Sequence, residues 1–84
     1  YSEKEDVVAA TINEAIEDIN AQRYNEAIEK LLPYKDDSRT WNTLGSASLL
    51  MDNFEAARVW FEAAAKAGDE DAGKNLELLN EIIR

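Results

Sequence analysis

The sequence contains neither cysteine nor histidine. Without cysteine there are no disulfides, no thiolate metal ligands and no thiol nucleophile. Without histidine, the commonest general base and the commonest metal ligand are missing as well, so Ser38, Ser46 and Ser48 have no imidazole to activate them. We therefore expect no catalytic residue, no bound metal and no cofactor.

Basic residues are also scarce, and apolar runs are short. The 84 residues include 9 Lys and Arg against 18 Asp and Glu, which gives a net charge of −9. Nucleic acids and anionic membranes attract basic patches, so this charge balance disfavours both as partners. No apolar run approaches the roughly 18 residues of a membrane-spanning helix, so we expect no membrane insertion. The expected partner is a protein or peptide with a neutral or basic surface.

The chain opens on Tyr1, without an initiator methionine or a signal-peptide profile, which suggests a piece of a longer protein. Its targeting information would then lie elsewhere, and both the cytoplasm and the bacterial periplasm or cell envelope remain open. A length of 84 residues suits one small domain, which we expect to span residues 1–84.

Apolar residues recur with the period of a helix along almost the whole chain, and no segment alternates as a strand would. We expect an all-α fold of about five helices. The first helix should cover residues 3–20, with Ser2 and Glu5 spaced as a capping box. Its apolar stripe comprises Val8, Ile12, Ala15, Ile16 and Ile19. The second helix, from about Tyr24, should stop at Pro33, because proline cannot continue a helix interior.

Three further helices follow a polar connector. Ser38 or Thr40 is expected to cap the third helix, and Asp52 with Glu55 the fourth. Gly68 should end the fourth helix and Asp69 should cap the fifth. The fifth helix carries an apolar stripe of Ala72, Leu76, Leu79 and Ile83.

The third and fourth helices carry six residues at fixed spacings, Trp41, Leu44, Gly45, Ala57, Phe61 and Ala64. These residues resemble the tetratricopeptide repeat, an α/α-hairpin family. The first helix of that repeat carries the pattern W-x2-L-G-x2-Y, and its second carries A-x3-F followed by small residues. This chain departs from the pattern at Ser48, where tyrosine is usual, and at Asp69, where proline is usual. The run from Trp60 to Leu79 is also similar to the related SEL-like repeats.

The resemblance implies a right-handed superhelix segment built from stacked hairpins. Residues 38–68 would be the best repeat, residues 1–35 a degenerate copy before it, and residues 69–84 a capping helix. In such a hairpin Gly45 allows the second helix to approach closely, and we expect it to touch Ala57.

The resemblance also implies a function in protein binding, because the first helices of successive hairpins line a concave surface. The positions that would face this groove are Arg39, Asn42, Ser46, Leu49 and Leu50. The amide of Asn42 would hold a peptide backbone, Arg39 would meet a carboxylate, and the two leucines would add apolar contact.

A structural role is the alternative. Leu78 and Ile82 form a second apolar flank on the fifth helix, beside its capping stripe. This flank would serve as an assembly face, covered by a neighbouring domain or by a second copy in a weak homodimer. A slight rotation of the helix onto Trp60 would cover it instead.

Interpretations of the chain as an enzyme or as a calcium-binding protein fit the sequence poorly. Carboxylate pairs such as Glu14 and Asp18 suit a solvated helix face better than acid–base chemistry. Asp69, Asp71 and Gly73 resemble part of a calcium loop. An EF-hand, however, needs glycine at loop position six and glutamate at position twelve, where this chain has Lys74 and Asn80.

Overall fold

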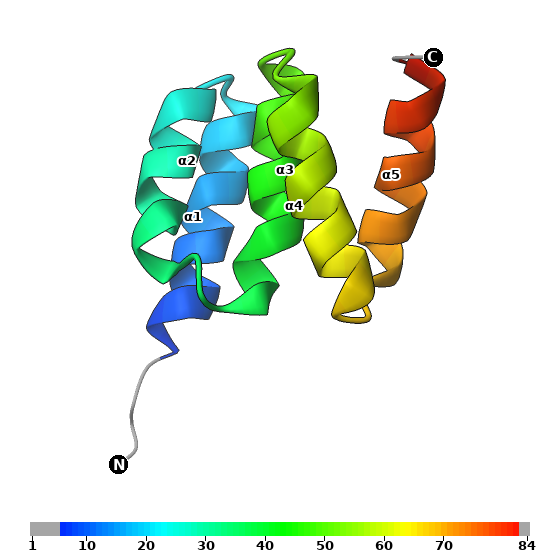
Figure 1. Ribbon diagram of the computed structural model, residues 1–84. Helices are drawn as coiled ribbons and strands as arrows, with labels where there is room; N and C mark the ends of the chain where they lie inside the picture. Colours follow the sequence, from blue (N-terminus) through cyan, green and yellow to red (C-terminus); the bar gives the residue numbers. More distant parts are fainter. Residues whose placement is uncertain (1–5, 83–84) are drawn as a thin grey trace.

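A computed structural model of the chain describes residues 6–82, which form an all-α fold without a strand. Its helices are α1 (Val7–Asn20), α2 (Tyr24–Leu31), α3 (Trp41–Leu50), α4 (Phe54–Lys66) and α5 (Glu70–Ile82). Successive helices run in alternating directions, so α1, α3 and α5 run one way and α2 and α4 the other (Figure 1). The predicted all-α class with about five helices is confirmed for the described residues.

Each helix packs against the next one along the chain, and α3 also touches α1 and α5. The three helices that run in the same direction therefore form one row. We call the side of the molecule on which they lie the α1–α3–α5 face.

The first helix begins later than predicted. α1 starts at Val7 and not at residue 3, and its N-cap is Asp6, whose carboxylate accepts a hydrogen bond of 3.2 Å from the Ala9 N–H. An aspartate at this position satisfies one of the N–H groups that have no partner within the helix. The predicted capping box of Ser2 and Glu5 lies outside the described residues.

The caps of the last two helices are partly as predicted. Asp69 caps α5, because its Oδ1 accepts from the Ala72 N–H at 3.2 Å. The N-cap of α4 is Asn53, whose Oδ1 accepts from the Ala56 N–H at 3.4 Å. The predicted cap, Asp52, instead occupies the turn before it.

The polar connector between α2 and α3 contains two short 3₁₀ turns, η1 (Leu32–Tyr34) and η2 (Ser38–Thr40). Pro33 lies in the first turn of η1, so the α-helix ends just before it, as predicted. The Thr40 hydroxyl donates to the Asp37 carbonyl at 2.8 Å, and neither Thr40 nor Ser38 caps α3 through its side chain. Thr40 is fully buried, so it anchors the connector against the helices.

The two hairpins turn in the same way at a spacing of 30 residues. Gln22 and Asp52 both adopt a left-handed conformation, with φ of 67° and 62°. The residues after them, Arg23 and Asn53, donate their N–H groups to the carbonyl five residues earlier, at 2.7 and 2.9 Å. These bonds satisfy carbonyls at the ends of α1 and α3, which would otherwise lack helical partners.

The core consists of two clusters of buried apolar side chains, one between the first hairpin and α3 and the other between α4 and α5. The first comprises Ala15, Ala27, Leu31 and Leu44, and the second comprises Ala57, Phe61, Ala64, Ala72 and Leu79. Trp41 packs against both clusters and so joins the hairpins, whereas Trp60 packs against the first. The predicted stripe of α1 is only partly buried, because Ile16 is 42% exposed.

Gly45 lies against α4, where its nearest neighbour is Phe61. A Cβ atom at this position would lie 2.6 Å from two ring carbons of Phe61, and the three nearest atoms all belong to this ring and not to the expected Ala57. Since Phe61 is fully buried, its ring has little freedom to move away.

We predict that Gly45→Ala unfolds more easily than Gly73→Ala, by about 1–3 kcal/mol, the usual cost of overpacking a core. Gly73 is the matched control. It also lies within a helix, but a Cβ there meets nothing within 4 Å. Both variants gain the same helix propensity, so urea unfolding of the pair isolates the contact with Phe61. Equal stabilities would refute the tight contact.

We also predict that Phe61→Ala lowers the free energy of unfolding by about 3–5 kcal/mol, because it removes a fully buried ring. Val59→Ala, on the same helix at a side chain 62% exposed, should change it by less than about 0.5 kcal/mol. Thermal and urea denaturation followed by circular dichroism would measure both changes. Similar losses in the two variants would contradict the assignment of Phe61 to the core.

Candidate functional site

The α1–α3–α5 face contains a pair of asparagines that joins two of its helices. Asn75 Nδ2 on α5 donates to Asn42 Oδ1 on α3 at 3.0 Å, and both side chains are half-buried. Among the described residues nothing bonds the remaining NH₂ group of Asn42 or the remaining carbonyl oxygen of Asn75. The pair therefore presents one donor and one acceptor side by side, as a peptide group does. The sequence predicted Asn42 as a site residue but not its partner.

The other predicted groove residues of α3 follow Asn42 along the helix. Ser46 and Leu49 are half-buried, and Leu49 packs against the second core cluster. Leu50 is 50% exposed. Leu50 is therefore the predicted groove leucine with most surface left for a partner, whereas Leu49 also contributes to the core.

Arg39, the fifth predicted groove residue, binds carboxylates of its own chain. Its guanidinium lies 2.8 Å from Asp37 Oδ2 and 2.7 Å from Asp6 Oδ2. Hydrogen bonding to Arg39 lowers the pKa of Asp37 to about 2 and lowers the pKa of Asp6. Arg39 thus ties the start of α1 to the connector before α3, and these ion pairs would compete with the predicted contact to a ligand carboxylate.

The two predicted assembly residues on α5 are half exposed. Leu78 is 52% exposed and Ile82 is 51% exposed, whereas Ala72 and Leu79 on the capping stripe are fully buried. Leu76 is half-buried against the second core cluster, and Ile83 lies outside the described residues. Because Leu78 and Ile82 are half exposed, no rotation of α5 onto Trp60 buries this flank.

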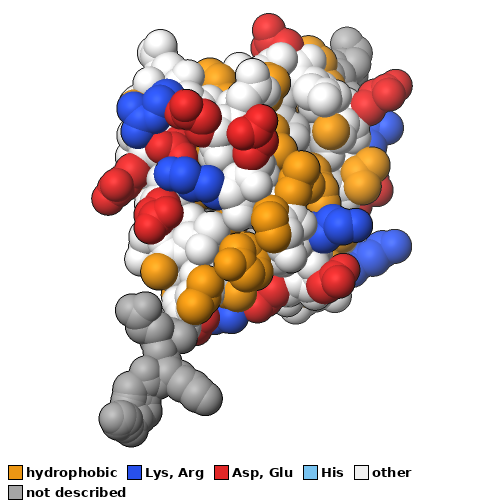
Figure 2. Space-filling view, turned by 90° about the vertical axis from the view of Figure 1, so that its left-hand side faces the viewer, with side chains coloured by type: hydrophobic (Ala, Val, Ile, Leu, Met, Phe, Trp, Pro, Cys, Tyr) orange, Lys and Arg blue, Asp and Glu red, His pale blue; other side chains and the backbone are white. Residues whose placement is uncertain are grey.

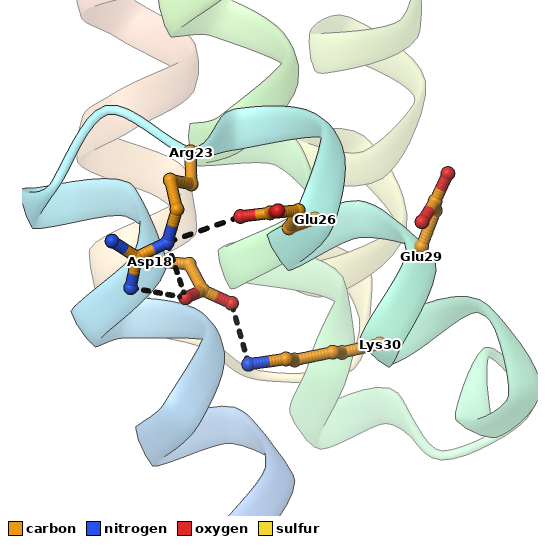
Figure 3. A pocket seen from close by; sticks show the side chains of 5 residues that line it. All are labelled: Asp18, Arg23, Glu26, Glu29 and Lys30. Atoms are coloured by element: carbon orange, nitrogen blue, oxygen red, sulfur yellow. Dashed lines mark hydrogen bonds and ion pairs between the residues drawn. The ribbon is translucent and has the colours of Figure 1, made fainter.

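A charged cluster that the sequence did not predict lies between α1 and α2. The Asp18 side chain is only 4% exposed and lies 2.9 Å from Arg23 Nη2 and 2.8 Å from Lys30 Nζ. These residues line an open hollow together with Glu26 and Glu29 (Figure 3). Treating Asp18 as part of a solvated helix face was therefore wrong.

Burial of this carboxylate is tolerated because both of its oxygens have cationic partners. Hydrogen bonds from Lys30 and from Arg23 lower the pKa of Asp18. The hydrogen bond between Lys30 and Asp18 also raises the pKa of Lys30. The sequence did carry a signal. Aligning the hairpins places Asp18 opposite Ser48, a core-facing position of the repeat pattern, and a carboxylate there requires cations nearby.

The outer surface of this first hairpin carries both charged and hydrophobic side chains (Figure 2). Figure 2 shows charged side chains of both signs at the upper left and again at the lower right of this view, with a diagonal band of hydrophobic side chains between them. Because Arg23 and Lys30 are already paired with Asp18, the hollow offers little free positive charge to a phosphate or another anion.

Other site types find little support among residues 6–82. No group of three or more acidic side chains within this range is arranged to hold a metal ion. In this part of the chain every helix is too short or too polar to span a lipid bilayer. Comparisons with protein-family models, with curated proteins and with solved structures find no match.

We predict a specific pH dependence for the Asp18 ion pairs. Because the pKa of Asp18 is lowered in the folded state, the pairs stabilise the fold above the unfolded pKa of about 4. This stabilisation is lost as the pH falls through the lower folded-state pKa. Asp18→Asn should therefore be less stable than the native chain at pH 7 and should show a shallower loss of stability towards low pH.

Glu29→Gln makes the same charge change at the exposed edge of the hollow and serves as the control. It should retain the acid-induced loss of stability seen in the native chain. Urea unfolding between about pH 2 and pH 7 would measure all three proteins, the range being set by the lowered pKa of a carboxyl group. An Asp18→Asn curve parallel to the native curve would contradict the role of these pairs.

Proposed function

We propose that the chain is a non-catalytic, tetratricopeptide-like interaction module that binds a peptide or a partner protein on its α1–α3–α5 face. The Asn42–Asn75 pair is the observation that carries this proposal. A half-buried amide pair with one spare donor and one spare acceptor suits a peptide group of an extended ligand. Leu50, exposed on the same helix as Asn42, adds apolar surface.

The proposed contacts differ from the sequence-based set in one respect. We leave Arg39 out, because its guanidinium already binds Asp6 and Asp37. Recognition of a terminal carboxylate by Arg39 is therefore not part of the proposal. Asn42, Ser46, Leu49 and Leu50 remain, joined by Asn75 from α5.

We predict that peptides selected from a random display library against the native chain bind at this face. Asn42→Ala and Leu50→Glu should each lower the affinity for the selected peptides by about fivefold or more, the loss expected when a central contact is truncated. Val59→Glu adds the same charge at an exposed position on α4 and should leave binding nearly unchanged. Titration calorimetry would measure the affinities.

Two results would overturn this proposal. One is a selection that enriches no peptide, and the other is a set of peptides that bind all three variants equally. Double-stranded DNA, tested at low salt, should not bind at micromolar concentration, because a protein with a net charge of −9 repels a polyanion.

Assembly through α5 is the second candidate, favoured by the half-exposed Leu78 and Ile82. In that case the domain would be a structural spacer, and a neighbouring domain or a second copy would cover the flank. Sedimentation velocity over a range of concentrations tests the homodimer. Dimerisation that Leu78→Glu with Ile82→Glu abolishes would support this second function.

A further inference from the structure

The Asn42–Asn75 hydrogen bond fixes the register between α3 and α5. Both helices run in the same direction in Figure 1, so residues at equal distances beyond the two asparagines lie at similar heights. Leu49 follows Asn42 by seven residues, and Ile82 follows Asn75 by seven residues. Two helical turns, or about 10 Å, therefore separate the asparagine pair from a level occupied by two aliphatic side chains.

Helix geometry also shows on which side of α5 the exposed flank lies. Leu78 and Ile82 follow Asn75 by three and seven residues, spacings that place side chains on the same helix face. Because Asn75 points to α3, its stripe lies on the side of α5 that adjoins α3. The exposed flank is therefore on the α1–α3–α5 face and does not point away from the row.

We infer that Leu78 and Ile82 are not a separate assembly face but the far half of one binding surface with Asn42, Leu50 and Asn75. The asparagine pair lies at one end of this surface, and the aliphatic side chains of α3 and α5 lie at the other. The inference rests on the proposed function and extends its surface along α5 from Asn75 to Leu78 and Ile82.

The residues in and around this surface suit a partner peptide that combines apolar side chains with positive charge. Apolar side chains fit the aliphatic end, where Leu50, Leu78 and Ile82 are each about half exposed. Beside this flank, the exposed acids Asp71, four residues before Asn75, and Glu81, three after Leu78, outnumber the base Lys74. A Lys or Arg of the peptide would therefore meet complementary charge.

The same charges disfavour a second copy as the occupant. Two chains that each carry a net charge of −9 repel one another, whereas a basic peptide is attracted. The apolar contact available on one flank of one helix is small compared with the roughly 800 Å² per partner of a stable interface.

The test compares Leu78→Ser/Ile82→Ser with the native chain, using individual synthetic peptides enriched in the selection against the native chain. Binding should fall by about tenfold or more in the double variant, and the enriched peptides should be rich in aliphatic residues and in Lys or Arg. The matched control is Leu32→Ser/Val59→Ser, which removes two exposed aliphatic side chains outside α3 and α5. This control should bind as the native chain does, and unfolding curves should show both variants folded.

The outcomes separate this inference from the function on which it rests. Peptides that lose affinity with Asn42→Ala but not with the α5 double variant would overturn the inference and leave the proposed function standing. Enrichment of acidic peptides would overturn the proposed occupant. A concentration-dependent dimer of the native chain, abolished by Leu78→Ser/Ile82→Ser, would overturn the inference in favour of self-association. Failure to enrich any peptide would overturn both the function and the inference.

Discussion

The close approach of α3 and α4 at Gly45 is the constraint on which the second half of the molecule depends. Without a side chain at this position, the ring of Phe61 fits against the α3 backbone. Phe61 belongs to the same buried cluster as Ala72 and Leu79, so its position also determines where α5 docks. The same cluster therefore links the Gly45 contact to α5, the helix from which Asn75 donates to Asn42.

The two hairpins share their turn geometry but are held together by different chemistry. The second uses an aromatic ring against glycine, whereas the first has Ala15 and Leu31 at the corresponding positions, 30 residues earlier. The first hairpin adds the Asp18–Lys30 ion pair between its helices. The stability of the first hairpin therefore depends more strongly on pH than that of the second.

The sequence predicted the class and number of helices well, because helical periodicity, Pro33 and Gly68 act over a few residues. It failed where the answer depended on residues far apart in the chain. Spacing showed that Gly45 faces another helix but not that Phe61 meets it. Likewise, the sequence indicated Asn42 as a groove residue, but its pairing with Asn75 depends on how α5 docks across 33 positions of chain. Asp18 was assigned to the solvated surface because it is charged, although its position in the repeat pattern indicated the core.

The outer surface of the first hairpin carries charged groups that would lose their hydration if another hairpin packed on it. Leu44 and Trp60, which the second hairpin packs against the first, correspond to Glu14 and Lys30, 30 residues earlier. A further hairpin stacked on α1 and α2 in the same manner would strip water from these charged groups and would compete for the Lys30 contact with Asp18. Two copies of the chain that met through this end would bury charge on both sides, so the structure disfavours end-to-end association there.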